Sequence, residues 1–156
     1  MFLAKDIMTS PTISVSKDHT VKEALDLLAK HSISGLPVVD AEEKVIGIIS
    51  GTDIMRYSQQ KKVVPLTSGS FWVSPYTESD DIANIRRGFE TLHRTIIEMV
   101  MTKKVYSVSE DTATTEVARL MNRRKINRVP VVNETGKLVG IVTRADIVKC
   151  MADTER

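Results

Sequence analysis

Two short segments of the chain carry a hydroxyl and a carboxylate at the same spacing. Ser50 is followed three residues later by Asp53, and Thr143 by Asp146. At the start of a helix, such a hydroxyl caps free backbone N–H groups, and the carboxylate lies in the positive end of the helix dipole. The same N–H groups and hydroxyl suit a phosphate, and an ionised carboxylate accepts hydrogen bonds from neighbouring ribose hydroxyls. Capping and ligand binding are both open, and they are compatible.

Residue types that serve catalysis or metal binding show no comparable pattern. His19, His31 and His93 share no metal-ligand spacing, and Cys150, the single cysteine, has no evident base near it. The sequence contains no GxSxG motif, no phosphate-binding loop and no paired carboxylates. We therefore expect no catalytic residues, no metal site and no enzymatic activity.

Length and composition are those of a globular protein. The chain has 156 residues, of which 42% are hydrophobic and 27% charged. Its longest apolar runs have the length of a strand, far below the roughly 20 residues of a membrane span. The N-terminus lacks the apolar region of a signal peptide, and a single cysteine excludes an internal disulfide. These features predict a soluble, cytoplasmic protein without a membrane partner.

An internal repeat organises the chain. Met8-Thr9 recurs as Met101-Thr102, and every later match has the same offset of 93 residues without a gap. Between positions 8 and 54, 17 of 47 residues are identical to their counterparts. This regularity predicts two copies of one structural unit. We assign residues 1–60 to the first repeat, 61–95 to a linker loop and helix, and 96–156 to the second repeat.

Each repeat has the pattern strand, helix, strand, strand, helix. Short strands are predicted at residues 12–15 and 105–108, and an amphipathic helix follows from about residue 21. Thr20 and Glu23 predict a capping box at the start of that helix, whereas Ala113 replaces the capping threonine in the second copy. Two apolar strands joined by a polar turn then lead to a last helix near Ser50 or Thr143.

The fold class predicted from this pattern is α+β, with two β-α-β-β-α repeats packed as a pseudo-two-fold pair. A unit of about 50 residues buries too little apolar surface to be stable on its own. Two copies that share a core, with clefts where they meet, satisfy that requirement.

The segment between the repeats is predicted to be a loop followed by a helix that starts at about Ser79. Apolar residues at alternating spacings of three and four predict one buried face on this helix: Ile82, Ile85, Phe89, Leu92, Ile96 and Met99. This face either packs on the repeats or serves a dimer or partner. Phe71, Trp72 and Tyr76 cluster just before it and either fold the loop back or anchor a partner.

The repeats resemble the CBS domain, the cystathionine-β-synthase motif, and the chain resembles a stand-alone CBS pair, or Bateman module. The resemblance rests on residues 6–9, 33–40 and 45–54 and on their counterparts 126–133 and 138–147. It covers both repeats and implies the CBS-pair fold. It also implies a regulatory module that senses an adenine nucleotide (AMP, ADP or ATP) or an S-adenosylmethionine-type ligand, with no obligatory cofactor.

The same resemblance implies roles for the two hydroxyl–carboxylate segments. In CBS pairs that bind adenosine-type ligands, the matching aspartate holds the ribose and the matching serine or threonine lies near the phosphate. Carried over, this assigns Asp53 and Asp146 to ribose and Ser50 and Thr143 to phosphate, with Thr52 in the same candidate set.

Two arginines distinguish the second repeat. Arg128 occupies the place of Gly35, where nucleotide-binding CBS proteins carry a basic residue that meets phosphate, and Arg144 replaces Gly51. An arginine fork suits phosphate oxygens. The alternative is that both arginines are solvated at the surface. Because only the second repeat carries these arginines, the two sites are expected to be unequal.

Four further residues are candidates for the wall of an adenine pocket. Ile33 and Ile126 supply apolar wall or backbone contacts for a base, and Ile13 and Tyr106 lie where CBS adenine pockets often begin. Packing in the core is the alternative for each of them.

The partners implied are a small adenosyl ligand, a second copy of the chain in a homodimer, and an effector protein of unknown identity. The first alternative is a structural or interaction module without a physiological small ligand. The second is a nucleic-acid binder that uses the basic stretch 119–128. A net charge of +2 and few aromatic residues argue against nucleic acid.

Overall fold

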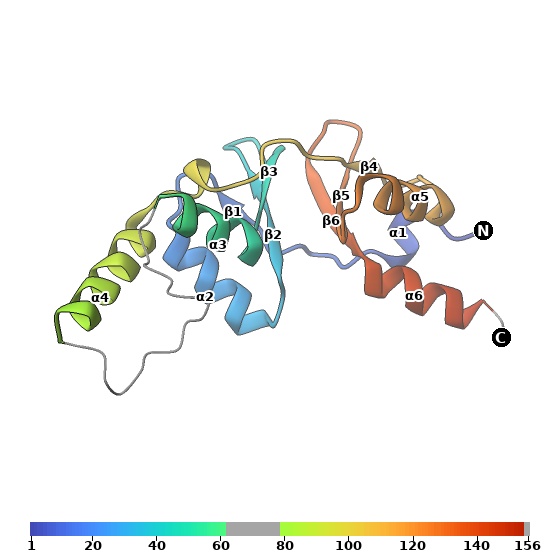
Figure 1. Ribbon diagram of the computed structural model, residues 1–156. Coiled ribbons are helices and arrows are strands. Elements are labelled where there is room, and N and C mark those ends of the chain that lie inside the picture. The colour runs from blue at the N-terminus through green and yellow to red at the C-terminus, as the bar shows by residue number, and fades with distance from the viewer. Residues whose placement is uncertain (62–78, 155–156) are drawn as a thin grey trace. The chain divides into compact units, whose positions relative to one another are not determined.

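The computed structural model describes residues 1–61 and 79–154 (Figure 1). One set of elements comprises α1 (Ala4–Ile7), β1 (Val15–Ser16), α2 (Val21–His31), β2 (Gly35–Val39), β3 (Val45–Ser50) and α3 (Gly51–Gln60). The elements that follow are α4 (Ser79–Arg94), the 3-10 helix η1 (Ile97–Met99), β4 (Val108–Ser109), α5 (Thr114–Arg124), β5 (Arg128–Val132), β6 (Leu138–Thr143) and α6 (Arg144–Asp153). The order from β1 to α3 repeats from β4 to α6, which confirms the predicted α+β repeat.

Each repeat forms its own three-stranded sheet, in the order β1-β2-β3 or β4-β5-β6. In the second sheet, β4 runs parallel to β5 and β5 runs antiparallel to β6, with Arg128 opposite Thr143. The first strand of each repeat is shorter than predicted. Only Val108 and Ser109 find partners on β5, so residues 105–107 lie outside the strand, as residues 12–14 do before β1.

Local capping sets the start of the second helix in each repeat. Thr20 accepts a hydrogen bond from the backbone N–H of Glu23, and Glu23 accepts one from the backbone N–H of Thr20, which confirms the predicted capping box. Ala113 makes no side-chain cap at the start of α5. Both helices end at a residue with positive φ, Ser32 or Lys125, which terminates the helix in the left-handed conformation.

The chain divides into two compact units that exchange segments. Unit 1 comprises Met1–Ser14, Val39–Ile46 and Lys104–Arg156, and unit 2 comprises Val15–Val38 and Gly47–Lys103. The first residues of the chain thus belong with the second repeat, and the residues that lead into the second repeat belong with the first.

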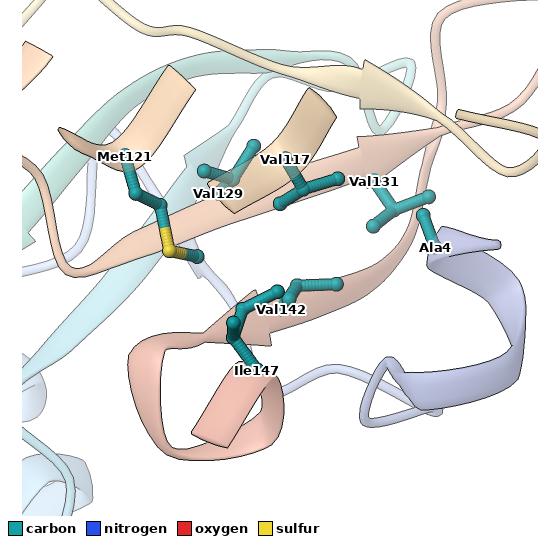
Figure 2. Packing of buried hydrophobic residues seen from close by; sticks show 7 residues of the cluster. All are labelled: Ala4, Val117, Met121, Val129, Val131, Val142 and Ile147. Carbon is teal, nitrogen blue, oxygen red and sulfur yellow. The ribbon is translucent and has the colours of Figure 1, made fainter. Parts of the chain in front are cut away.

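Unit 1 is built around apolar side chains from five elements (Figure 2). The buried members are Ala4, Val117, Met121, Val129, Val131, Val142 and Ile147. Helix α1 joins this core through Ala4, and the Nζ of Lys5 lies 2.7 Å from a carboxylate oxygen of Asp111. The hydrogen bond to Asp111 raises the pKa of Lys5. A segment distant in sequence thereby completes the core of the second repeat.

In unit 2, η1 docks beside the start of α2. The backbone N–H of Ile97 donates to the carbonyl of His19 at 2.8 Å, and the side chain of Ile97 is fully buried. Helix α4 packs against α2, and Leu92 on α4 is buried. The predicted buried face is wrong for Ile82, which lies on α4 and is exposed. It is also wrong for Ile96 and Met99, because α4 ends at Arg94 and both residues are exposed.

Phe71, Trp72 and Tyr76 lie outside the described residues. Within the described part of the chain, no helix combines the length and apolar character needed to cross a membrane.

Candidate functional site

The first hydroxyl–carboxylate segment forms the start of α3. The Oγ of Ser50 accepts a hydrogen bond from the backbone N–H of Asp53 at 3.2 Å. In return, Oδ2 of Asp53 accepts from the backbone N–H of Ser50 at 3.0 Å and from its hydroxyl at 2.9 Å. Ser50 is therefore an N-cap, as its spacing to Asp53 predicts.

The second segment repeats this geometry at the start of α6. The Oγ1 of Thr143 accepts from the backbone N–H of Asp146 at 3.3 Å. Oδ2 of Asp146 accepts from the backbone N–H of Thr143 at 2.8 Å and from its hydroxyl at 2.9 Å. Each aspartate thus uses one carboxylate oxygen, Oδ2, to hold its helix start, and only Oδ1 differs between the two sites.

Oδ1 of Asp53 is engaged by residues of its own unit. The hydroxyl of Thr102 donates to it at 2.8 Å, and Nη1 of Arg56 lies 3.5 Å away. The Asp53 residue is 8% exposed. All four polar partners of this carboxylate belong to unit 2, so the group is both buried and satisfied from within that unit.

Oδ1 of Asp146 has a different environment, although the sequence supplies similar residues. Thr9 and Lys149 stand 93 residues from Thr102 and Arg56 in the repeat. Within residues 1–61 and 79–154, no hydrogen bond or ion pair joins either of them to Asp146. Asp146 is half-buried. One oxygen of this carboxylate therefore remains free of partners among the described residues.

Thr102 is held in place by its backbone. Its N–H donates to the carbonyl of Ile48 at 2.8 Å, and the N–H of Ile48 donates to the carbonyl of Thr102 at 3.0 Å. Thr9 is bonded to Ile141 in the same way in unit 1, at 2.9 and 3.2 Å. The exchanged segments thus bring an equivalent threonine to the last strand of each unit.

The close approach of this segment depends on a glycine. A Cβ on Gly47 would lie 2.6 Å from Sδ of Met101 and 3.1 Å from the carbonyl oxygen of Thr102. We expect Gly47→Ala to destabilise unit 2 by about 1–3 kcal/mol, because the Met101 side chain must move and the Thr102 carbonyl must give way slightly to admit the methyl group. Chemical denaturation measures this effect. Gly51→Ala is the control, because a Cβ on Gly51 meets no atom within 4 Å; equal losses from both substitutions would refute the steric explanation.

Two of the predicted phosphate residues, Thr143 and Arg144, lie at the start of α6, and a third lies on the neighbouring strand β5. Arg128, at the beginning of β5, pairs with the cap residue Thr143 across the sheet. Arg144 is the first residue of α6, is exposed, and donates its backbone N–H to the carbonyl of Asn127 at 2.9 Å. The fold therefore brings the positions of Arg128, Thr143, Arg144 and Asp146 together within unit 1.

The other predicted ligand residues have more varied surroundings. Ile126 packs against the core of unit 1, as its alternative role requires. Ile33 is 37% exposed, Thr52 is exposed on the first turn of α3, and Ile13 is partly buried before β1.

Tyr106 lies beside two cations. Cζ of Arg124 is 4.6 Å from the centroid of its ring, and Nζ of Lys104 is 5.8 Å away. The ring is thus a cation–π acceptor within unit 1. Arg119, elsewhere in the basic stretch, forms an ion pair with Glu116. These interactions engage part of the predicted basic surface within its own unit.

Within residues 1–61 and 79–154, no three histidine, cysteine, aspartate or glutamate residues gather so as to hold a metal ion.

Sequence reasoning missed Thr102 and Arg56 as partners of Asp53. Arg56 lies three residues after Asp53 on α3, so helical spacing was a signal for it. For Thr102 the only signal was the recurrence of Met-Thr at the offset of the repeat. That recurrence does not predict that the threonine pairs with β3 and reaches Asp53.

The fold and these two helix starts define a class of protein: a pair of similar α+β repeats, each with a last helix capped by a hydroxyl and a carboxylate. The chain belongs to the CBS domain family, which matches residues 4–60 and 97–153. Protein MJ1426 of Methanocaldococcus jannaschii is 30% identical over 155 residues, covering 97% of this chain and 92% of that protein. Three further curated relatives are longer, and the chain spans only 22% to 23% of their length.

Solved CBS pairs share the fold. The CBS domain pair of protein MJ0100, in complex with 5′-methylthioadenosine and S-adenosyl-L-methionine, has a TM-score of 0.73 and 29% identity. The match covers 99% of this chain and 98% of that one. CBSX2 of Arabidopsis thaliana, in complex with AMP, has a TM-score of 0.72 and 25% identity, with both chains fully covered. CBS pairs similar to this chain therefore bind adenosine-containing molecules.

Proposed function

We propose that this protein is a regulatory module that binds an adenosine-containing small molecule at the start of α6. The observation that carries the proposal is that only one of the two oxygens of the Asp146 carboxylate is bonded to the described residues. Oδ2 holds the helix cap, while Oδ1 accepts no hydrogen bond from the described residues. A carboxylate oxygen has two lone-pair sites, so Oδ1 is suited to the hydroxyls of a ribose.

The surroundings of Asp146 favour a ligand that also carries negative charge. The dipole of a helix favours an anion at its first turn, although the N–H groups of Arg144 and Asp146 in this turn are bonded to Asn127 and Thr143. Arg144 is exposed in that turn, and the backbone of Arg128 pairs with that of Thr143. A guanidinium group donates two parallel hydrogen bonds to a phosphate. This chemistry favours AMP, ADP or ATP, while S-adenosylmethionine and 5′-methylthioadenosine share only the ribose contact.

The protein acts through a conformational change rather than through catalysis. A ligand alters the behaviour of an effector protein, or of a homodimer, only by binding one arrangement more tightly than another. The proposed output is therefore a ligand-dependent change in how the module associates. No obligatory cofactor enters this scheme, and neither does nucleic acid.

An interaction module without a small ligand is the second candidate. The surroundings of Asp53 support it. At this aspartate, one of the two that the CBS resemblance assigns to ribose, Oδ1 is already contacted by Thr102 and Arg56 of the same chain. The two candidates differ in a measurable property, which is saturable binding of an adenosine compound.

The test is isothermal titration calorimetry with AMP, ATP, S-adenosylmethionine and 5′-methylthioadenosine, together with thermal unfolding. A ligand at about 100 times its Kd stabilises the fold by about 2.7 kcal/mol, a shift of several degrees in Tm for a chain of this size. We expect Asp146→Asn to weaken binding more than about tenfold, because a charged hydrogen-bond acceptor is lost.

The matched control is Asp153→Asn, which removes the same charge from the last residue of the same helix. This variant is expected to bind as the wild type does. If no compound binds to the folded wild-type protein, the interaction module replaces the ligand sensor as its function.

A further inference from the structure

We propose that the hydroxyl of Thr102 is an internal substitute for ligand at Asp53, so that the chain binds one adenosyl ligand, at Asp146, and not two. Thr102 is then the residue that makes the two repeats unequal. This inference rests on the proposed function and specifies which of the two family positions is open.

The chemistry of the substitution is direct. A ribose hydroxyl would donate a hydrogen bond to the outer oxygen of an aspartate at this position, and the Thr102 hydroxyl donates to Oδ1 of Asp53 at 2.8 Å. Nη1 of Arg56 approaches the same oxygen at 3.5 Å. A ligand hydroxyl must therefore compete for this oxygen with the hydroxyl of Thr102, which is already bonded to it, and with the guanidinium of Arg56 beside it.

The internal hydroxyl has an advantage over a free ligand. The backbone of Thr102 is tied to Ile48 by two hydrogen bonds, and the Oδ2 of Asp53 is tied to Ser50. Both ends of the contact are therefore positioned before it forms, whereas a free ligand loses translational and rotational freedom on binding. Burial of Asp53 strengthens the internal bond, because the contact lies away from bulk water.

The second repeat supplies an internal comparison. Thr9 has the same backbone pairing with Ile141 that Thr102 has with Ile48. Among the described residues, however, no hydrogen bond joins the hydroxyl of Thr9 to Asp146. The inequality therefore lies in side-chain contacts, of which the Thr102 hydroxyl supplies the only hydrogen bond to Oδ1 among the described residues, and not in the path of the backbone.

The experiment is calorimetric titration of wild type, Thr102→Val and Thr9→Val with AMP and with S-adenosylmethionine. We expect wild type and Thr9→Val to bind one ligand per chain, and Thr102→Val to bind two. Thr102→Ser, which keeps the hydroxyl, is expected to bind one. In a Thr102→Val/Asp146→Asn double variant, the remaining site is expected to be lost when Asp53→Asn is added.

Hydrogen–deuterium exchange of the wild type keeps the test independent of variant folding. Added AMP is expected to protect residues 143–147 and to leave residues 50–54 unchanged. Two ligands per wild-type chain, protection at residues 50–54, or a single site in folded Thr102→Val would overturn the inference while leaving the sensor function intact. Absence of any binding in all variants would instead remove the proposed function, and the inference with it.

Discussion

Ile49→Ala is expected to lower the free energy of unfolding of unit 2 by about 2–5 kcal/mol, the range for a large aliphatic side chain truncated in a core. Ile49 is fully buried on β3, directly before the cap residue Ser50. Its removal leaves a cavity that the sheet fills only partly. The loss is measured by urea denaturation, followed by far-ultraviolet circular dichroism.

The neighbouring substitution Ile48→Ala is the control. Ile48 is only partly buried, and its hydrogen bonds to Thr102 use backbone atoms that alanine keeps. We expect a smaller loss from Ile48→Ala than from Ile49→Ala. If the two losses are equal, the core of unit 2 does not lie on the side of β3 that Ile49 faces.

The second large effect is expected from Asp53→Ala, which should destabilise the protein by about 2–4 kcal/mol. The substitution removes the carboxylate that accepts hydrogen bonds from the backbone N–H and hydroxyl of Ser50, although the bond from the backbone N–H of residue 53 to the Ser50 hydroxyl remains. It also removes the acceptor for the hydroxyl of Thr102, and hydrogen bonds to a charged group contribute about 1.5–3 kcal/mol. The two losses share one side chain and are not strictly additive.

Asp146→Ala is the matched comparison and is expected to cost about 1–2 kcal/mol, because it removes the same two bonds to its own cap residue, Thr143, but no contact equivalent to that between Thr102 and Asp53. Thermal and urea unfolding of both variants without ligand measure the difference. Equal losses would show that the contact between Thr102 and Asp53 contributes nothing to stability. This comparison needs no ligand, so it tests the contact separately from the proposed function.

The expectations for Asp53 and Asp146 share one physical origin, which is that an aspartate has two oxygens. In both helix starts, Oδ2 serves folding by satisfying the N–H and hydroxyl groups of the cap residue. Oδ1 serves folding at Asp53 and is proposed to serve binding at Asp146. A ligand-binding residue that also caps a helix couples binding to stability, because the ligand adds free energy to the folded state alone.

Much of the fold follows from patterns that are local in sequence. The repeat offset of 93 residues predicts two similar units, and the apolar spacing after Thr20 predicts α2. The capping boxes are predictable because their members lie three residues apart on one helical turn. The linker helix starts where predicted, at Ser79, although it ends at Arg94, two residues before Ile96.

The candidate site also has parts that the sequence predicts and parts that it does not. The pairs Ser50–Asp53 and Thr143–Asp146 are predictable from spacing and from the resemblance to CBS domains. The cations beside Tyr106 are not, because Arg124 comes from α5 and reaches the ring through tertiary packing. Ile126 is a further case, since an apolar side chain before a strand suits either a pocket wall or a core, and packing places it against the core.

The sequence by itself determined the repeated α+β unit, the helix caps and the family, because these depend on periodicity and on residues within one turn of one another. Only the tertiary structure decided that residues 1–14 join the second repeat and residues 96–103 the first. It alone brought Thr102 to Asp53 across 49 positions of the chain. Two equivalent threonines carry the same local signal, and only the packed positions of their side chains determine which of them reaches a carboxylate.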